Sequence, residues 1–341
     1  MSSSRSALVL PTHTPKLFDE AVSAASELLC AGEIVALPTE TVYGLAANAL
    51  KPAEVARIYE IKGRPSHNPI IVHVEGLKMA ATCVGKWPEG AQLLADAFWP
   101  GPITFVLPKA DCIPDIVTAG GDTVGVRWPG HPLMRQVIRK CGFPLAAPSA
   151  NLSNEISPTN AEHVRKSLGD RLPLVVDGGQ SQIGIESTVI DLTVSPARIL
   201  RPGIIHEESI AAVLGESVLG GNQVAVGEQL KSPGALLKHY SPKARVVVKH
   251  WDASSELDRL IGELAEDRSR LWLLTHTNVP LHIDSNHVCV VPHDPEAYAR
   301  ALYAELHRCD EEGAEVILVE AVPDSPEWRG IADRLARAAA N

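Results

Sequence analysis

Long apolar runs and closely spaced cysteines are both missing from the sequence, and each absence excludes a class of protein. No stretch approaches the roughly 20 consecutive apolar residues of a membrane-spanning helix, and the apolar run at 7–10 is too short for a secretory signal peptide. The six cysteines form no Cys-x-x-Cys pair, which argues against a structural zinc site or a disulfide framework. We therefore predict a cytoplasmic protein without membrane contact, in which the cysteines are small buried side chains.

A surplus of basic residues is also missing. The chain has 31 Lys and Arg against 41 Asp and Glu, and its formal net charge is −10 at pH 7. Domains that wrap nucleic acid usually carry a strong basic excess, so this balance argues against such a role. The sequence also contains no Gly-x-x-x-x-Gly-Lys-Ser/Thr segment, so a bound nucleotide would not be held in a Walker loop. Any cationic site must therefore be local.

The patterns that are present predict a two-domain α/β protein. With 341 residues, 45% hydrophobic and 21% charged, the chain is ordinary for a globular protein but long for a single core. Helical and strand-like periodicities alternate in both halves, so we predict a first domain over 1–214, an interdomain linker over 215–243 and a smaller α/β domain over 244–341. Predicted helices include 16–31, 89–98, 255–266 and 295–309, and predicted strands include 33–37, 70–74, 103–107 and 246–248.

The basic segment Lys-Gly-Arg-Pro-Ser-His-Asn-Pro at 62–69 is a candidate anion site. Gly63 permits close approach of the backbone to a ligand, and the two prolines restrict the residues before them. Lys62 and Arg64 should therefore be held in place, and such a pair of cations suits a polyphosphate. The alternative is a surface turn with solvated charges. We expect exposed loop side chains here, whose removal leaves folding intact.

Hydroxyl-rich loops follow several predicted strands, where open α/β sheets tend to place ligands. These loops lie at 38–45, 148–153 and 184–191. Arg127 shares one face of the predicted strand 122–127 with other alternate residues, and it needs either an internal carboxylate or a ligand anion as partner. His73, on the strand 70–74, could equally be a core histidine.

Six segments in this order resemble one known family. They are Pro-Thr-Glu-Thr-Val-Tyr-Gly-Leu, Lys-Gly-Arg-Pro-Ser-His-Asn-Pro, Phe-Trp-Pro-Gly-Pro, Pro-Ser-Ala-Asn, Glu-Ser-Thr-Val and Leu-Arg-Pro-Gly. The series resembles the YrdC/Sua5 family of L-threonylcarbamoyladenylate synthases, and the segment 232–242 resembles the interdomain linker of the long Sua5 form. The implied fold is a YrdC-like twisted open sheet with helices, followed by a smaller Rossmann-like α/β Sua5 domain.

The resemblance implies a nucleotidyltransferase that makes threonylcarbamoyl-AMP and pyrophosphate from ATP, L-threonine and bicarbonate or CO₂. The product serves the synthesis of N6-threonylcarbamoyladenosine at position 37 of certain tRNAs. A transient hand-off to the tRNA threonylcarbamoyltransferase machinery is expected, rather than direct tRNA binding. Mg²⁺ should accompany the ATP. Because the sequence shows no acidic cluster, we predict no protein ligands for this ion and expect nucleotide oxygens and water to hold it.

The motif positions also imply the site residues. The catalytic set around the phosphates comprises Lys62, Arg64, Ser149 and Asn151. The residues expected to bind ATP are Arg64, Asn68, Thr123, Ser149, Ser157 and Arg201. Those expected around threonine are Thr39, His73, Arg127, Ala147 and Ser187, with the Arg127 fork facing the carboxylate. The linker is expected to fold over the cleft as a lid, with Lys238 or Tyr240 reaching the ligands.

Two departures from the family pattern and three alternatives remain. Ala46 stands where Gly is frequent, which should affect packing only. Ala-Leu-Leu at 235–237 replaces a frequent Met-Lys-Tyr, which leaves the aromatic contacts of the linker open. The alternatives are a carbamoyl-adenylating relative, an RNA-binding module and a non-catalytic regulatory protein. The first usually carries an acylphosphatase-like domain and Cys-rich zinc fingers, which this sequence lacks.

Overall fold

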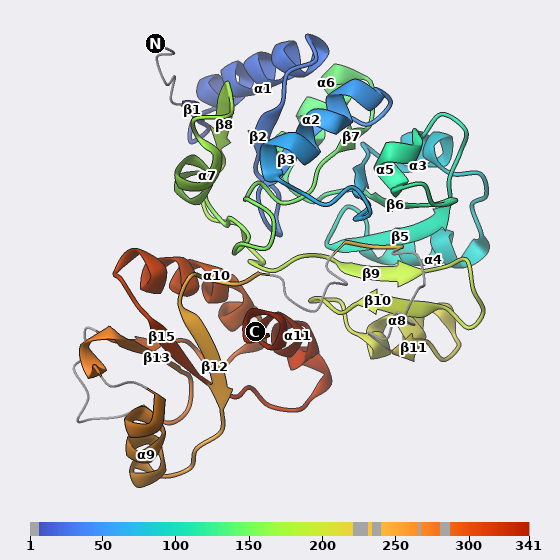
Figure 1. Cartoon of the computed structure of the whole chain (residues 1–341). Helices are drawn as coiled ribbons and strands as arrows, with labels where there is room; N and C mark the ends of the chain where they lie inside the picture. Colours follow the sequence, from blue (N-terminus) through green and yellow to red (C-terminus); the bar gives the residue numbers. More distant parts are fainter. Residues whose placement is uncertain (1–6, 221–230, 234–239, 265–266, 280–286, 341) are drawn as a thin grey trace.

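The computed structural model describes residues 7–220, 231–233, 240–264, 267–279 and 287–340. Within these residues, two α/β domains lie side by side, each built on its own sheet (Figure 1). The first sheet has 11 strands and the second has 4. The predicted fold class, an open sheet with helices followed by a smaller α/β domain, is confirmed.

The first sheet mixes parallel and antiparallel pairs, in the order β1-β8-β2-β3-β7-β4-β6-β5-β9-β10-β11. Its strands are β1 (Leu8–Pro11), β2 (Val35–Leu37), β3 (Gly44–Asn48), β4 (Val72–His73), β5 (Ile103–Pro108), β6 (Thr123–Arg127), β7 (Leu145–Ala146), β8 (Leu174–Asp177), β9 (Thr188–Asp191), β10 (Arg198–Arg201) and β11 (Leu219–Gly220). The parallel pairing of β4 with β6 sets His73 directly beside Arg127. Two predicted site residues are thus neighbours across the sheet.

Helices cover both faces of this sheet. They are α1 (Pro15–Cys30), α2 (Pro52–Lys62), α3 (Leu77–Cys83), α4 (Glu89–Phe98), α5 (Asp115–Thr118), α6 (Pro132–Cys141), α7 (Ala161–Leu168) and α8 (Glu207–Leu214). Side chains alternate along each strand, so in β2 Ala36 enters the core beneath α2 while Val35 and Leu37 enter the core beneath α1 and α6. The sheet is therefore buried on both sides, and its ligand-binding groups must lie at its strand ends.

Helix α2 extends to the first residue of the basic segment 62–69, which was expected to be a loop. Lys62 is its last residue, and Gly63 terminates it in the left-handed conformation with φ 60°. Glycine adopts this conformation without steric cost, so the helix can stop abruptly before Arg64. Lys62 therefore belongs to a helix and is held by it, whereas the sequence analysis placed it in a loop.

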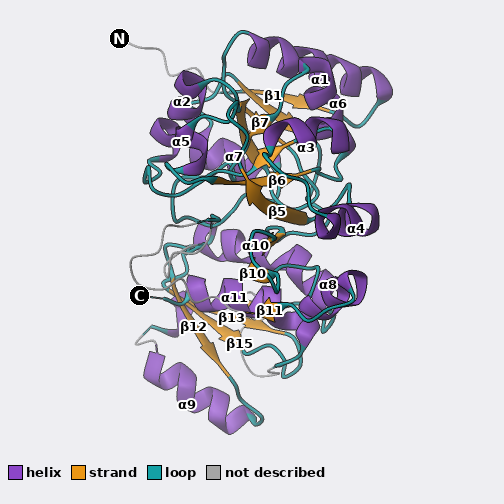
Figure 2. Ribbon diagram, turned by 90° about the vertical axis from the view of Figure 1, so that its right-hand side faces the viewer, coloured by secondary structure: helices purple, strands orange, loops and turns teal. Residues whose placement is uncertain are grey.

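The second domain has a four-stranded sheet in which all pairs are parallel, in the order β12-β15-β13-β14. Its elements are β12 (Arg245–Lys249), α9 (Ser254–Leu264), β13 (Leu271–Thr275), β14 (Val288–Val290), α10 (Pro295–Glu311), β15 (Val316–Glu320) and α11 (Arg329–Ala338). Every residue of β13 and β15 is buried, as expected for parallel strands covered on both faces. Helices α10 and α11 lie on the side of this domain that faces the first domain, while α9 lies on the far side (Figure 2).

Some sequence-based expectations need correction. Cys30 and Cys112 are exposed and Cys141 is half-buried, so the expectation of buried cysteines holds for the other three alone. The first sheet continues past the predicted domain boundary, because β11 pairs with β10. In the part of the chain that the structure describes, no helix is long and apolar enough to cross a membrane.

The two domains share a hydrophobic core. Tyr303 of α10 and Trp328, just before α11, belong to the same buried cluster as Val42 and Ile185 of the first domain. Tyr240, at the end of the linker, is fully buried within this cluster. The second domain is thus packed against the first through a continuous apolar contact, which fixes its helices relative to the strand ends of the first sheet.

A stacked histidine pair crosses the same interface. The rings of His163 in α7 and His307 in α10 have their centroids 3.9 Å apart. Burial, and then the charge of His307, lowers the pKa of His163 to about 3, and burial also lowers the pKa of His307. Both imidazoles are therefore neutral in the folded protein at pH 7.

We predict that the free energy of unfolding decreases as pH falls from 6.5, the ordinary pKa of histidine, towards about 3. In this window the unfolded chain binds protons that the buried imidazoles do not, so acid favours unfolding. Replacing His163 with Gln should flatten this dependence in urea denaturation series at several pH values. An unchanged slope would show that the stacked pair does not contribute to it.

Candidate functional site

A pocket lies between strand ends of the first domain and residues of the linker. Many of the predicted site residues line it, namely Thr39, Arg64, His73, Arg127, Ala147, Ser149, Ser187, Arg201 and Tyr240. Residues that the sequence analysis did not single out also form its wall, among them Thr41 and Glu186. Segments that are far apart in the sequence thus converge on one cavity.

Other predicted residues lie behind the wall. Asn68 accepts a hydrogen bond from Arg64, and Ser157 donates to Glu186, so both support a wall residue. Thr123 is at the end of β6 opposite to Arg127, and because a strand rises about 3.3 Å per residue this places it roughly 13 Å along the strand. The predicted lid residue Lys238 lies outside the described residues.

Lys62 is buried, in contrast to the exposed side chain that we expected. Its Nζ donates to the carbonyl oxygens of Ser149, at 2.6 Å, and Asn151, at 2.5 Å. Burial, and then the charge of Arg64, lowers the pKa of Lys62 well below its usual range. Lys62 therefore fastens the loop 149–151 to the end of α2, and the expectation of an exposed side chain is wrong.

Arg64 and Arg201 carry charge into the pocket without a carboxylate partner. The acceptors of Arg64 are Asn68 and the carbonyl of Pro69, and those of Arg201 include the carbonyl and hydroxyl oxygens of Ser187. Burial lowers the pKa of Arg64 to about 10 and also lowers that of Arg201, yet Arg64 stays protonated at pH 7. Among the described residues, neither arginine forms a salt bridge. The wall is consequently suited to an anion.

Arg127 has the internal carboxylate that the sequence analysis considered as one alternative. It donates to Glu40 at 2.6 Å, to Thr41 at 3.0 Å and to the carbonyl of Gly101 at 3.2 Å. Burial opposes ionisation of Glu40, but the charge of Arg127 and hydrogen bonds from Arg127 and the backbone together lower the pKa of this carboxyl. A guanidinium has five N–H donors, so these three bonds orient Arg127 while leaving donors for a ligand.

His73 is both a buried histidine and a wall residue. Burial, and then the charge of Arg127, lowers its pKa to about 3, so the imidazole is neutral at pH 7. Its Nδ1 is buried and has no hydrogen-bond partner in the protein. A buried polar atom without a partner is costly, so a ligand that bonds to it here is favoured.

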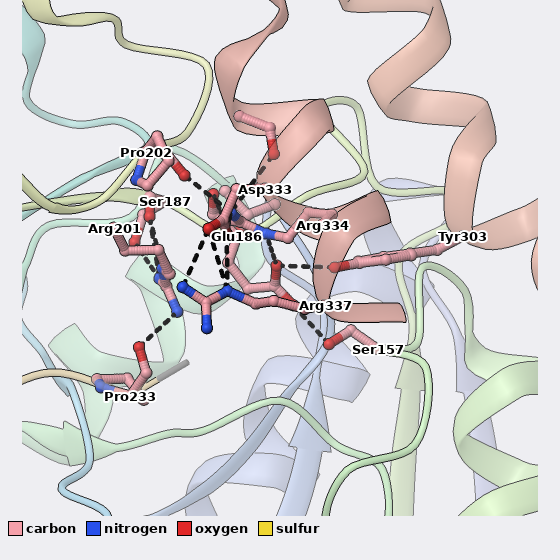
Figure 3. Close-up of polar contacts among 12 residues, drawn as sticks. Ser157, Glu186, Ser187, Arg201, Pro202, Pro233, Tyr303, Asp333, Arg334 and Arg337 are labelled. Carbon is pink, nitrogen blue, oxygen red and sulfur yellow. Dashed lines mark hydrogen bonds and ion pairs between the residues drawn. The ribbon is translucent and has the colours of Figure 1, made fainter. Parts of the chain in front are cut away.

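Glu186 is the most important residue that the sequence analysis missed. One of its carboxylate oxygens accepts from Ser157 at 2.5 Å, and the other accepts from Tyr303 at 3.1 Å and Arg334 at 2.8 Å (Figure 3). Burial opposes its ionisation, but Arg334 and then Arg201 lower its pKa to about 2. Glu186 is the first residue of the Glu-Ser-Thr-Val segment. Nothing in the sequence pattern connected it to Tyr303 or Arg334, which lie more than 100 residues further along the chain.

The wall offers guanidinium groups, hydroxyls and a neutral imidazole, a set that suits phosphate and carboxylate groups. Among the residues that the structure describes, no three His, Cys, Asp or Glu side chains are grouped to hold a metal ion. The two carboxylates of the region, Glu40 and Glu186, are bound to arginines. The chemistry of the wall is therefore that of an anion-binding site.

Comparisons with known proteins identify the family. A Sua5/YciO/YrdC family model, described as telomere recombination, matches residues 27–203, and a model described as the C-terminal domain of threonylcarbamoyl-AMP synthase matches residues 205–340. A threonylcarbamoyl-AMP synthase of Pyrococcus abyssi is 38% identical over 314 residues, which are 90% of each chain. The chain belongs to the threonylcarbamoyl-AMP synthase family.

Further members of the family agree with this assignment. A threonylcarbamoyl-AMP synthase of Bacillus subtilis is 41% identical over 325 residues, 94% of this chain and 93% of its own. The crystal structure of P. abyssi Sua5 complexed with L-threonine matches with a TM-score of 0.88 and 36% identity, covering 97% of both chains. Because the match extends over both domains, the resemblance to the long Sua5 form is confirmed.

We predict that Lys62→Met lowers the free energy of unfolding by about 2 kcal/mol or more, because two buried carbonyl groups lose their donor. Lys51 provides the matched control, since it precedes the same helix, is exposed and makes no capping bond with its side chain. Lys51→Met should change stability by less than about 0.5 kcal/mol. Denaturant titration of both variants measures the difference, and equal stabilities would mean that the buried contacts of Lys62 contribute nothing net.

Proposed function

We propose that this protein makes threonylcarbamoyl-AMP and pyrophosphate from ATP, L-threonine and bicarbonate or CO₂. The observation that supports this most directly is the buried wall on which Arg64 and Arg201 keep their charge without a carboxylate partner. Such a wall is costly in an empty protein and favourable around a polyphosphate. The product named by the synthase family, threonylcarbamoyl-AMP, supports the choice of ATP and threonine as the ligands of this wall.

The triphosphate is assigned to the part of the pocket formed by Arg64, Ser149 and Arg201. Lys62 and Asn151 do not line the pocket. Instead, the hydrogen bonds from Lys62 to the carbonyls of Ser149 and Asn151 fix the loop that carries Ser149. Asn68 and Ser157 likewise set Arg64 and Glu186 in place. Mg²⁺ enters with ATP as part of the substrate, with nucleotide oxygens and water as its main ligands.

Threonine is assigned to the part of the pocket formed by Thr39, His73, Arg127, Ala147 and Ser187. The remaining donors of Arg127 face the carboxylate, and the unpartnered Nδ1 of His73 is available to a polar group of the amino acid. Thr39 already bonds Thr41 and the carbonyl of Val42, so its own position is fixed. These residues bind and orient, which is what a selective amino-acid site requires.

The chemistry needs little beyond positioning and charge. The threonine amine adds to CO₂ and loses a proton to form a carbamate, and the carbamate oxygen then bonds to the α-phosphorus. The bond between the α-phosphorus and the bridging oxygen breaks, and that oxygen leaves with pyrophosphate. Guanidinium groups held in advance stabilise the charge that develops on the phosphates, so no protein nucleophile is required.

The product is assigned to N6-threonylcarbamoyladenosine formation in tRNA, through hand-off to a tRNA threonylcarbamoyltransferase in the cytoplasm, where ATP and tRNA occur together. An RNA-binding role is less compatible with the site. Arg64, Arg127 and Arg201 are buried, with exposed fractions of 8%, 4% and 3%, so a polynucleotide backbone cannot reach them. A small anion that enters the pocket can.

We predict that pyrophosphate release requires ATP, L-threonine and bicarbonate together, because the carbamate must form before it attacks phosphorus. Valine, which has the shape of threonine but lacks its hydroxyl, should support at least about 100-fold less turnover, since it would leave buried polar groups unpaired. A coupled pyrophosphate assay with each component omitted in turn measures both. Equal turnover with valine would contradict a site that recognises the hydroxyl.

We also propose that the linker closes the pocket. Two described residues of the linker, Pro233 and Tyr240, line the cavity. Arg201 donates to the carbonyl of Pro233 at 3.4 Å. Tyr240 is fully buried and adopts φ 60°, which is uncommon for a residue other than glycine, so the position of this residue against the pocket is closely defined. Closure would keep water from the mixed anhydride.

We predict that ATP with threonine slows tryptic cleavage after Lys231 and Lys238 by at least about tenfold. Lys231 already bonds Asp191 at 3.0 Å, so ligand binding at the adjacent wall should further reduce local opening. ATP with valine serves as the control and should protect less. Cleavage that is as fast at saturating ligand as without it would show that the segment is only a tether.

A further inference from the structure

Arg334, in the last helix of the second domain, holds two neighbouring strands of the first domain. Its side chain is fully buried. Its Nε donates to the carboxylate of Glu186 at 2.8 Å, its Nη2 to the main-chain carbonyl of Glu186 at 3.1 Å, and its Nη1 to the carbonyl of Pro202 at 2.8 Å (Figure 3). All three nitrogens of the guanidinium therefore reach the first domain, while Nη1 also donates to Asp333, its neighbour on the same helix, at 2.8 Å.

Each of these anchor points lies next to a residue of the pocket wall. Glu186 directly precedes Ser187, and Pro202 directly follows Arg201. Ser187 and Arg201 are themselves joined, because Arg201 donates to the carbonyl and hydroxyl oxygens of Ser187 at 3.0 and 3.1 Å. One guanidinium thus sets the spacing of the two chain segments that present this pair to the pocket.

We infer that Arg334 is a positioning residue, through which the second domain orients Ser187 and Arg201 for the substrates. This inference rests on the proposed function and gives the second domain a part in it. Arg334 acts through Glu186 and the backbone and does not line the pocket itself. The family resemblance and the sequence motifs pointed only to residues of the first domain and the linker.

The charge of Glu186 makes the position of Arg334 critical. Glu186 lines the pocket and forms its ion pair with Arg334 at 2.8 Å, and the charge of Arg201 further lowers the pKa of its carboxyl. Without Arg334, this carboxylate would depend on Arg201, the other arginine that lowers its pKa, and Arg201 would then have less freedom to bind a phosphate. Loss of Arg334 should therefore weaken ATP binding through competition inside the pocket, in addition to loosening the wall.

The geometry requires an arginine and a close helix. A lysine would supply one charge from a single nitrogen and could not span the side chain of Glu186, its carbonyl and the carbonyl of Pro202 together. Helix α11 can approach because its second residue is Gly330, where a Cβ would lie 2.8 Å from the carbonyl oxygen of Gly203. The ring of Tyr240 lies 5.4 Å from the Arg334 guanidinium, so the linker end packs on the same group.

The decisive measurement is the steady-state kinetics of threonine-dependent pyrophosphate release by the full-length protein. Arg334→Met should lower kcat/KM for ATP by about 100-fold, mainly through a higher KM, because a displaced wall of this kind can cost about that factor. Arg334→Lys should recover only a small part. Arg329→Met is the matched control, since Arg329 is on the same helix and bonds Glu207 and Glu208 across the interface at the surface, and it should stay within threefold of wild type.

Glu186→Gln separates positioning from general loss of structure. If Arg334 acts by neutralising Glu186, then Arg334→Met should cost about tenfold less in the Glu186→Gln background than in wild type. A purely structural role would lower the folded fraction, and hence kcat, while leaving KM for ATP unchanged. If Arg334→Met fails to fold, the comparison of Arg334→Lys in the two backgrounds provides the same test.

Two results would overturn the inference. One is that Arg334→Met lowers kcat/KM for ATP by the same factor in wild type and in the Glu186→Gln background. The other is an unchanged KM for ATP in a folded Arg334→Met protein. Failure of the proposed function would look different, because wild-type protein would then release no pyrophosphate in response to threonine. Isothermal titration of wild type with ATP alone shows whether the pocket binds the nucleotide, which separates an inactive preparation from a different activity. An ATP affinity reduced in Arg334→Met and restored by Glu186→Gln supports the inference independently of turnover.

Discussion

The pocket depends on guanidinium groups that are buried and yet held by uncharged oxygen atoms. Carbonyl and hydroxyl acceptors orient Arg64 and Arg201 without cancelling their charge. A carboxylate partner would also orient them, but it would neutralise the charge. Burial lowers the pKa of each, but the pKa of Arg64 remains at about 10, so this group still carries its proton at neutral pH. A site binds phosphate strongly when its positive charge is oriented, is not neutralised by a carboxylate and is shielded from solvent.

Where the pocket meets the second domain, the buried group is an anion, and charged and polar neighbours do bind it. There a carboxylate is the buried group, and its neighbours Arg334, Tyr303 and Ser157 donate to it until it is fully satisfied. The same wall therefore contains one neutralised anion beside cations that are left for a ligand. The two domains contribute different parts of this balance, because the first supplies the cations and Glu186, and the second supplies most of the groups that bind Glu186.

Much of the fold and of the wall could be predicted from the sequence because both depend on local signals. Helical periodicity located α4 at the residues the structure gives it, and the Lys-Gly-Arg segment located Arg64. The burial of Lys62 could not be predicted, since it depends on carbonyl groups about 90 residues away in the sequence meeting the end of α2. The partners of Glu186 were missed for the same reason, as no local pattern indicates which distant helix will pack on a strand end.

The sequence separation of 148 residues between Glu186 and Arg334 has a consequence for synthesis on the ribosome. The strands of the first sheet, including β9 and β10, are complete in the nascent chain long before helix α11 has been made. Until residue 334 emerges, the first domain carries a carboxylate at its wall that lacks its main counter-ion. The order of translation therefore makes this wall the last part of the site to reach its final form, and a chain released early would have a sheet without a finished pocket.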